Sequence, residues 1–214
     1  METIHIDQVL PYFISDTDQT VSDIWSGEAS FRKGQYYLIT AESGAGKSSL
    51  LSYMFGERSD YTGNILFDHQ KIDSIDPQEW NKIRQKNISF VFQGLRLFSE
   101  LTAYENIAIK NRLTNHKTDG EIAQMLAMAG LSEKINEKTG KLSFGQQQRL
   151  AIIRSLCQPF DFLLMDEPFS HLDDTNIEIM HRLIVHETEQ QNAGLVICSL
   201  GPKYPFSYHY CWKL

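Results

Sequence analysis

A nine-residue stretch rich in glycine and small residues carries the side chains best suited to bind phosphate. Gly44 and Gly46 allow the backbone to turn its N–H groups inward around phosphate oxygens. Lys47 adds a positive charge, and Ser48 adds a hydroxyl that can bind Mg²⁺. A helix is expected to begin here, and its N-terminal dipole end also favours an anion. The stretch comprises Ala41, Glu42, Ser43, Gly44, Ala45, Gly46, Lys47, Ser48 and Ser49.

Two adjacent carboxylates follow an apolar run farther along the chain. Residues 162–165 read Phe-Leu-Leu-Met, and Asp166 and Glu167 come next. A buried strand that ends in two acids needs a nearby cation or proton, because unpaired buried carboxylates are costly. Asp166 is expected to hold Mg²⁺, directly or through water. Glu167 is expected to orient and polarise an attacking water molecule. A solvated acidic turn is the alternative for this motif alone.

A third motif predicts a second helix start that could bind an anion. Residues 142–151 read LSFGQQQRLA. Ser143 is suited to be the N-cap, and Gln146 lies three residues later, as a capping box requires. The free N–H groups of such a helix end attract negatively charged ligands. An ordinary capped surface helix is the alternative.

The scaffold that must position these motifs is predicted to be a mostly parallel sheet covered on both faces. Four short runs rich in β-branched and aromatic residues indicate buried strands, at 36–40, 88–92, 162–165 and 195–199. Helical patterns lie between them, as in α/β folds. Ligands bind at the carboxyl ends of such strands.

Two further units are expected beside this sheet. Three flanking segments alternate polar and apolar residues and are expected to form a smaller antiparallel sheet, at 3–9, 63–68 and 208–213. The middle of the chain is helical in pattern, with a capping box at Thr118 and Glu121 and a stop at Gly130. We therefore expect one domain over 1–214, with an α/β core of 1–92 and 157–214 and an inserted helical subdomain of 93–156.

Composition excludes several other functions. The net charge of −7 and the lack of a Lys/Arg run argue against nucleic acid as a partner. No apolar stretch approaches the roughly 20 residues of a membrane-spanning helix, and the N-terminus does not resemble a signal peptide. The chain is therefore expected in the cytoplasm. The three cysteines, Cys157, Cys198 and Cys211, are far apart and predict buried thiols rather than disulfides or a zinc site.

Together the motifs resemble those of the ATP-binding cassette (ABC) family. Residues 41–49 resemble a Walker A P-loop, with Ala41 in place of the usual first glycine. Residues 162–168 resemble a Walker B strand, and 142–151 resemble the signature L-S-G-G-Q-Q-Q-R, with Phe144 replacing a glycine. The resemblance implies a P-loop NTPase fold that binds ATP and Mg²⁺. It also implies that Ser143, Gly145 and Gln146 contact the nucleotide held by a second subunit.

Other family landmarks occur in the expected order. Gln93 matches the Q-loop glutamine that reaches the metal, and residues 170–173, Ser-His-Leu-Asp, resemble the D-loop. Phe13, or alternatively Tyr12, matches the aromatic residue that stacks on adenine, although a core position is also open. The histidine that the family places after strand 195–199 is missing, and Leu200 stands there. His171 is not expected to take over its role.

The resemblance implies an ATPase subunit that energises a membrane transporter. Lys47, Gln93 and Glu167 carry the catalytic roles in this interpretation, and Leu200 predicts slow turnover. The implied partners are a second cassette subunit, as a homodimer, and a separate transmembrane permease at the cytoplasmic face of the inner membrane. The sequence around 97–107 resembles small cassettes of the lipoprotein-releasing and macrolide-exporter type. A hydrolysis-poor regulatory module or a cassette ATPase without a transport role are the alternatives.

Overall fold

A five-stranded parallel sheet forms the centre of the molecule. The computed structural model describes residues 1–14, 22–201 and 204–214. The strand order is β6-β7-β8-β3-β9, and every neighbouring pair is parallel. The strands β6, β7 and β8 are buried on both faces, which explains their almost unbroken apolar sequences. The bounds are β3 Tyr36–Thr40, β6 Ile88–Val91, β7 Phe162–Asp166, β8 Gly194–Ser199 and β9 Tyr210–Lys213.

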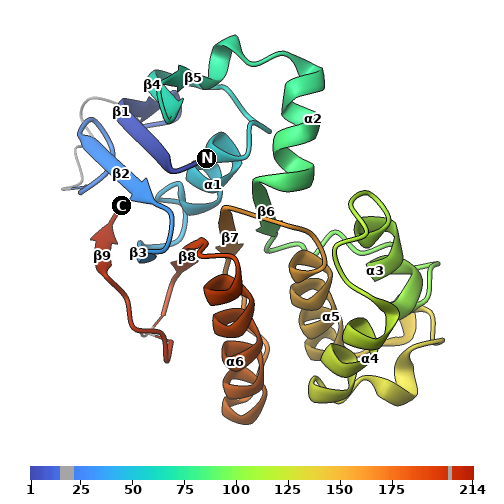
Figure 1. The fold of residues 1–214 in the computed structure, drawn as a ribbon. Helices are drawn as coiled ribbons and strands as arrows, with labels where there is room; N and C mark the ends of the chain where they lie inside the picture. The colour runs from blue at the N-terminus through green and yellow to red at the C-terminus, as the bar shows by residue number, and fades with distance from the viewer. Residues whose placement is uncertain (15–21, 202–203) are drawn as a thin grey trace.

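An antiparallel sheet of order β2-β1-β4-β5 lies beside it (Figure 1). Residues of β1 and β2 alternate between buried and exposed, because one face packs on the core and the other meets solvent. The predicted strands at 3–9 and 63–68 are confirmed here, whereas β2 and β5 were not predicted. The bounds are β1 Thr3–Pro11, β2 Glu28–Arg32, β4 Tyr61–Phe67 and β5 Gln70–Lys71.

The prediction for the last strand was wrong. β9 does not join the antiparallel sheet but extends the parallel sheet next to β3, with Tyr37 opposite Tyr210. The rings of this pair stack with centroids 5.2 Å apart. Only Trp212 of β9 is partly buried and its neighbours are exposed, so this strand is not covered on both faces as the strands farther into the parallel sheet are. Its alternating sequence therefore does not distinguish the two kinds of sheet. The same edge leaves Cys211 exposed, contrary to the expectation of a buried thiol, while Cys157 and Cys198 are buried.

Helices cover both faces of the parallel sheet. Leu164 and Val196 belong to a core shared with α1 and the antiparallel sheet, whereas Leu163 and Ile197 belong to a core shared with α5 and α6. This split follows from the period of two residues in a strand. The helix bounds are α1 Lys47–Met54, α2 Pro77–Lys86, α3 Ala103–Asn111, α4 Asp119–Met128, α5 Phe144–Leu156 and α6 Asp174–Gln190. Three single 3₁₀ turns span Ile72–Ser74, Ser132–Lys134 and Thr139–Lys141.

The segment between β6 and β7 is helical, with α3 and α4 at the end of the molecule away from the antiparallel sheet (Figure 1). The predicted capping boxes are confirmed, with Thr118 and Glu121 at the start of α4 and Ser143 and Gln146 at the start of α5. The left-handed Gly130, with φ +67°, follows α4 as predicted. We propose residues 93–156 as a helical subdomain on the α/β core, because α3 and α4 pack on α5 rather than on the sheet.

A buried ion pair ties this helical segment to α6. The Lys117 ammonium lies 2.8 Å from the Glu187 carboxylate, and their side chains are 12% and 5% exposed. Removing one partner leaves a buried charge without compensation. We therefore expect Lys117→Met to lower the free energy of unfolding in urea by about 3–5 kcal/mol. The exposed pair of Lys138 and Glu100 provides the control. Lys138→Met should cost less than about 1 kcal/mol. Similar losses in both variants would contradict a structural role for the buried pair.

Candidate active site

The glycine-rich loop connects β3 to α1 at the carboxyl edge of the parallel sheet. Gly44 and Gly46 have φ of +86° and +100°, so both positions favour glycine. Ala41 is not among the residues with positive φ, which explains why alanine is accepted at the first loop position. α1 begins without a side-chain cap on its N-terminal N–H groups. These groups therefore remain available to a bound anion.

Lys47 spans the loop from its place at the start of α1. Its ammonium donates to the carbonyl oxygens of Ala41 and Glu42, at 2.8 and 2.9 Å. The residue is buried, so the charge is held inside the loop instead of extending into solvent. A phosphate group seated in the loop would face a cation that is already positioned.

Trp25 supports the same loop and was missed by the sequence analysis. Its indole N–H donates to the carbonyl oxygen of Ala45 at 3.2 Å, and its ring is buried beneath Gly46. A Cβ at Gly46 would lie 3.1 Å from this ring and 3.2 Å from the Phe13 ring. Gly46 is therefore required by space as well as by its backbone angle. Trp25 belongs to no motif, so nothing near it in the sequence indicates the contact.

β7 delivers the two carboxylates opposite Lys47. Asp166 and Glu167 are 3% and 6% exposed, and one oxygen of each, Oδ1 and Oε1, lacks a partner among the described residues. Burial raises the pKa of both carboxyl groups above their ordinary values, and the Lys47 charge opposes this. The backbone of Glu167 has φ +47°, an uncommon value outside glycine that is often found at functional sites.

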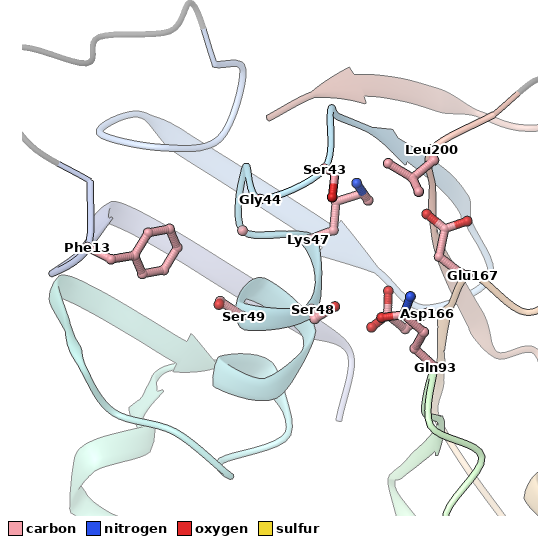
Figure 2. A pocket seen from close by; sticks show the side chains of 11 residues that line it. Phe13, Ser43, Gly44, Lys47, Ser48, Ser49, Gln93, Asp166, Glu167 and Leu200 are labelled. Atoms are coloured by element: carbon pink, nitrogen blue, oxygen red, sulfur yellow. The ribbon is translucent and has the colours of Figure 1, made fainter.

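The oxygen donors at this end of the pocket suit Mg²⁺. Ser48, Gln93 and Asp166 supply a hydroxyl, an amide and a carboxylate, and all three line one cavity (Figure 2). Hard oxygen ligands of these types, completed by water, are those that Mg²⁺ prefers. The unpartnered Oδ1 of Asp166 is the acceptor that a bound cation would satisfy.

Neutralising Asp166 should stabilise the ligand-free protein. A raised pKa means that the folded state binds this proton more tightly than the unfolded state, so stability falls as pH rises above the ordinary pKa of aspartate. At neutral pH, we expect Asp166→Asn to raise Tm in EDTA by about 2–4 °C, equivalent to about 1 kcal/mol. The variant should also lose the Mg²⁺-dependent part of stabilisation by ATP. A lower Tm in EDTA would show that the carboxylate already has a fixed partner.

The cavity between these groups has a volume of about 200 Å³. Phe13 lies at one end, and Asp166, Glu167, Gln93 and Leu200 lie at the other (Figure 2). Tyr12 does not line the cavity, which favours Phe13 as the aromatic residue near the nucleotide. The complete lining is Phe13, Ser43, Gly44, Gly46, Lys47, Ser48, Ser49, Gln93, Asp166, Glu167 and Leu200.

Six predicted contact residues lie outside this cavity. Ala41, Glu42 and Ala45 line a neighbouring groove on the other side of the loop. The other three occupy the first turn of α5 and its cap, and are Ser143, Gly145 and Gln146. The structure therefore does not bring the start of α5 to the phosphate loop of the same chain.

The start of α5 is instead joined to the segment after β7. Gln148 is buried, and its amide donates to the carbonyl oxygen of Glu167 at 3.1 Å and accepts from the backbone N–H of His171 at 3.2 Å. The Phe144 and His171 rings lie 4.3 Å apart. Gln148 therefore links α5 to the segment after β7, a contact that the sequence did not predict. His209 has a structural role, since its Nδ1 accepts from the backbone N–H of Tyr36.

Comparison with known proteins places these features in one family. The model of the ABC transporter family matches residues 27–170. The lipoprotein-releasing system ATP-binding protein LolD of Buchnera aphidicola is 34% identical over 171 residues, which cover 78% of this chain and 75% of that protein. LolD of Syntrophotalea carbinolica is 32% identical over 190 residues, covering 86% and 83%.

Solved structures agree with this relationship. A dimeric structure of the bacterial ABC transporter cassette MJ0796 superposes with a TM-score of 0.78 at 28% identity, covering 92% of this chain and 88% of that one. A dimeric post-hydrolysis state of the same cassette, bound to ADP and Pi, gives a TM-score of 0.77 at 28% identity, covering 92% and 87%. The residues matched by the family model include the phosphate loop, the buried carboxylates and α5. The chain belongs to the ABC transporter family of ATP-binding cassettes.

Proposed function

We propose that this chain is the ATP-hydrolysing subunit of a membrane transporter and works as an ATP-driven dimer. The observation that carries the proposal is the pair of buried, incompletely partnered carboxylates that faces Lys47 and Ser48 across one cavity. Such a site combines a phosphate-binding loop with one carboxylate that can ligate a cation and another that can accept a hydrogen bond from a water molecule. The names of the LolD relatives as ATP-binding proteins of a lipoprotein-releasing system support the transport role.

Each side chain of the cavity has its own role in the hydrolysis of ATP to ADP and phosphate. Lys47 and the N–H groups at the start of α1 bind and neutralise the terminal phosphates. Ser48, Gln93 and Asp166 would hold Mg²⁺, whose charge stabilises the phosphoryl oxygens when the ion is bound. Glu167 orients the attacking water and accepts its proton. The raised pKa of Glu167 makes its carboxylate a stronger base at this position.

We further propose that two copies enclose two nucleotides. One chain carries a phosphate loop and, separately, a capped helix end at α5 that its own loop cannot use. In a twofold dimer the N-terminal end of α5 in each copy contacts the nucleotide that the other copy holds. The phosphate loop and this helix end then bind the same nucleotide from opposite sides. The dimeric structures of the related cassette MJ0796 support this arrangement. Phe13, half exposed beside the loop, would stack on adenine.

Leu200 presents an apolar side chain to the cavity where a hydrogen-bond donor would stabilise the developing phosphoryl charge. Turnover should therefore be slow in any arrangement in which no other part of the dimer supplies that donor. Among the described residues, no helix is long and apolar enough to cross a bilayer. The LolD relatives are named as ATP-binding proteins of a lipoprotein-releasing system, and on that ground we propose that a separate transmembrane permease carries the cargo. Because ATP is available in the cytoplasm, we propose that this subunit works at the cytoplasmic face of the inner membrane.

The proposal is tested by purifying the tagged chain from membranes and from the soluble fraction with and without ATP. We expect a multi-spanning membrane protein to co-purify, and we expect measurable ATP hydrolysis by the isolated chain. Hydrolysis by a chain with which no membrane protein co-purifies would instead favour a cassette ATPase with no transport role. A tight ATP complex without hydrolysis, in the presence of the membrane partner, would favour a regulatory module.

A further inference from the structure

No histidine lines the cavity that the described residues form around Lys47 and Glu167. Leu200 occupies one end of that cavity, beside the Glu167 carboxylate, and its side chain is 56% exposed (Figure 2). An aliphatic side chain cannot donate a hydrogen bond to a phosphate oxygen. If the reaction uses an imidazole, that imidazole must come from elsewhere in the assembly.

His171 is the candidate that the structure points to. Its ring is exposed and packs against the exposed ring of Phe144, with centroids 4.3 Å apart and an interplanar angle of 59°. Nδ1 lies 2.8 Å from the Ser170 hydroxyl. In the part of the chain that the structure describes, Nε2 of His171 makes no hydrogen bond. The imidazole is thus oriented on two sides and has one nitrogen open to an outside ligand.

His171 is also fixed to the first turn of α5. Its backbone N–H donates to the buried Gln148, which lies on that helix. A Cβ at Gly145 would lie only 3.1 Å from the carbonyl oxygen of His171, so the two segments are in close contact. His171 therefore moves together with the N-terminal end of α5 and lies beside whatever ligand that helix end binds.

We propose that His171 contacts the terminal phosphate of the ATP held by the partner copy, and so supplies in trans the donor that Leu200 lacks. The inference rests on the proposed dimer, in which the start of α5 faces the partner's nucleotide. The imidazole N–H donates to a γ-phosphate oxygen and stabilises the charge that develops as the phosphoryl group is transferred. Phe144 acts as a positioning residue, since its ring supports the imidazole.

The contact between Phe144 and His171 also accounts for two departures from the family pattern. Phe144 stands where the signature usually has a glycine, and His171 stands where the D-loop usually has an alanine. Phe144 lies in the first turn of α5, and His171 lies in the segment between β7 and α6 that packs against this turn. Together they form a single aromatic platform that carries a hydrogen-bond donor.

Mixed dimers distinguish whether His171 acts on the ATP held by the partner (in trans) or on the ATP held by its own chain (in cis). Two chains with different affinity tags are co-expressed, purified by both tags, and tested for single-turnover ATP hydrolysis. The first dimer pairs Glu167→Gln with His171→Ala, so the one competent Glu167 faces an intact His171 of the partner. The second pairs the double variant Glu167→Gln/His171→Ala with the unmodified chain, so the competent site keeps its own His171 and lacks the partner's.

We expect the second mixed dimer to hydrolyse ATP roughly 10²–10³-fold more slowly than the first, the range for loss of one preorganised donor. Equal rates, or a slower first dimer, would overturn the proposal. Absence of any ATP-dependent dimer for the single Glu167→Gln variant would instead contradict the proposed function. The two failures are therefore distinguishable.

Single-chain variants separate donation from packing. His171→Gln retains a donor and should keep part of the rate, whereas His171→Phe retains the ring contact and should be as slow as His171→Ala. Leu200→His places an imidazole in the cavity itself and should restore the His171→Ala variant. His69→Ala, at an exposed position of the antiparallel sheet region, is the matched control and should retain the wild-type rate.

Discussion

Lys47→Ala is expected to weaken Mg-ATP binding by roughly 30- to 5,000-fold, which corresponds to about 2–5 kcal/mol for loss of one partner of a buried charged contact. The ammonium is buried and already held inside the phosphate loop by the carbonyl oxygens of Ala41 and Glu42. Little side-chain ordering is therefore needed when a phosphate arrives. Isothermal titration calorimetry with Mg-ATP measures the loss directly.

Two controls accompany this measurement. Lys82→Ala removes an exposed lysine of α2 and should leave the affinity unchanged. Circular dichroism and thermal unfolding should show that the Lys47→Ala chain remains folded, because its hydrogen bonds lie within one loop. Wild-type affinity in the Lys47→Ala variant would exclude residues 41–49 as the phosphate-binding loop.

Glu167→Gln is expected to lower the rate of ATP hydrolysis by roughly 10²–10⁴-fold while leaving ATP binding largely intact. The amide preserves the shape of the side chain but cannot accept a proton from water. In the proposed ATP-driven dimer, hydrolysis consumes the nucleotide that joins the two copies, so the variant should accumulate as a dimer with Mg-ATP. Size-exclusion chromatography with light scattering detects this dimer, and phosphate release measures the rate.

Glu133→Gln, at an exposed site after α4, is the matched control for charge and should behave as wild type.

Asp166→Asn should also abolish hydrolysis, but through loss of the metal ligand and with weaker binding of Mg-ATP. A monomer for Glu167→Gln under Mg-ATP would mean that Phe144 has altered the signature contact or that the true partner is a different cassette. Wild-type hydrolysis by Glu167→Gln would remove Glu167 from the reaction.

The sequence by itself determined the local parts of the site. A loop that requires positive φ at Gly44 and Gly46, a capping box at Ser143, and an apolar strand before Asp166 all depend on residues within a few positions of one another. Sterics and short-range hydrogen bonds impose such patterns, so they can be recognised without the fold. The strands β3, β6, β7 and β8 of the parallel sheet were predictable for the same reason, because burial on both faces requires a continuous apolar run.

Only the tertiary structure decided which distant residues meet. Trp25 reaches the carbonyl of Ala45, Phe144 packs on His171, and β9 lies parallel to β3, and none of these contacts follows from a local preference. Each depends on how whole elements pack, and packing selects partners by shape and volume rather than by spacing along the chain. The phosphate loop, the two carboxylates and the start of α5 could thus be predicted, whereas the contact between His171 and Phe144 at the start of α5 became visible only once the chain was folded.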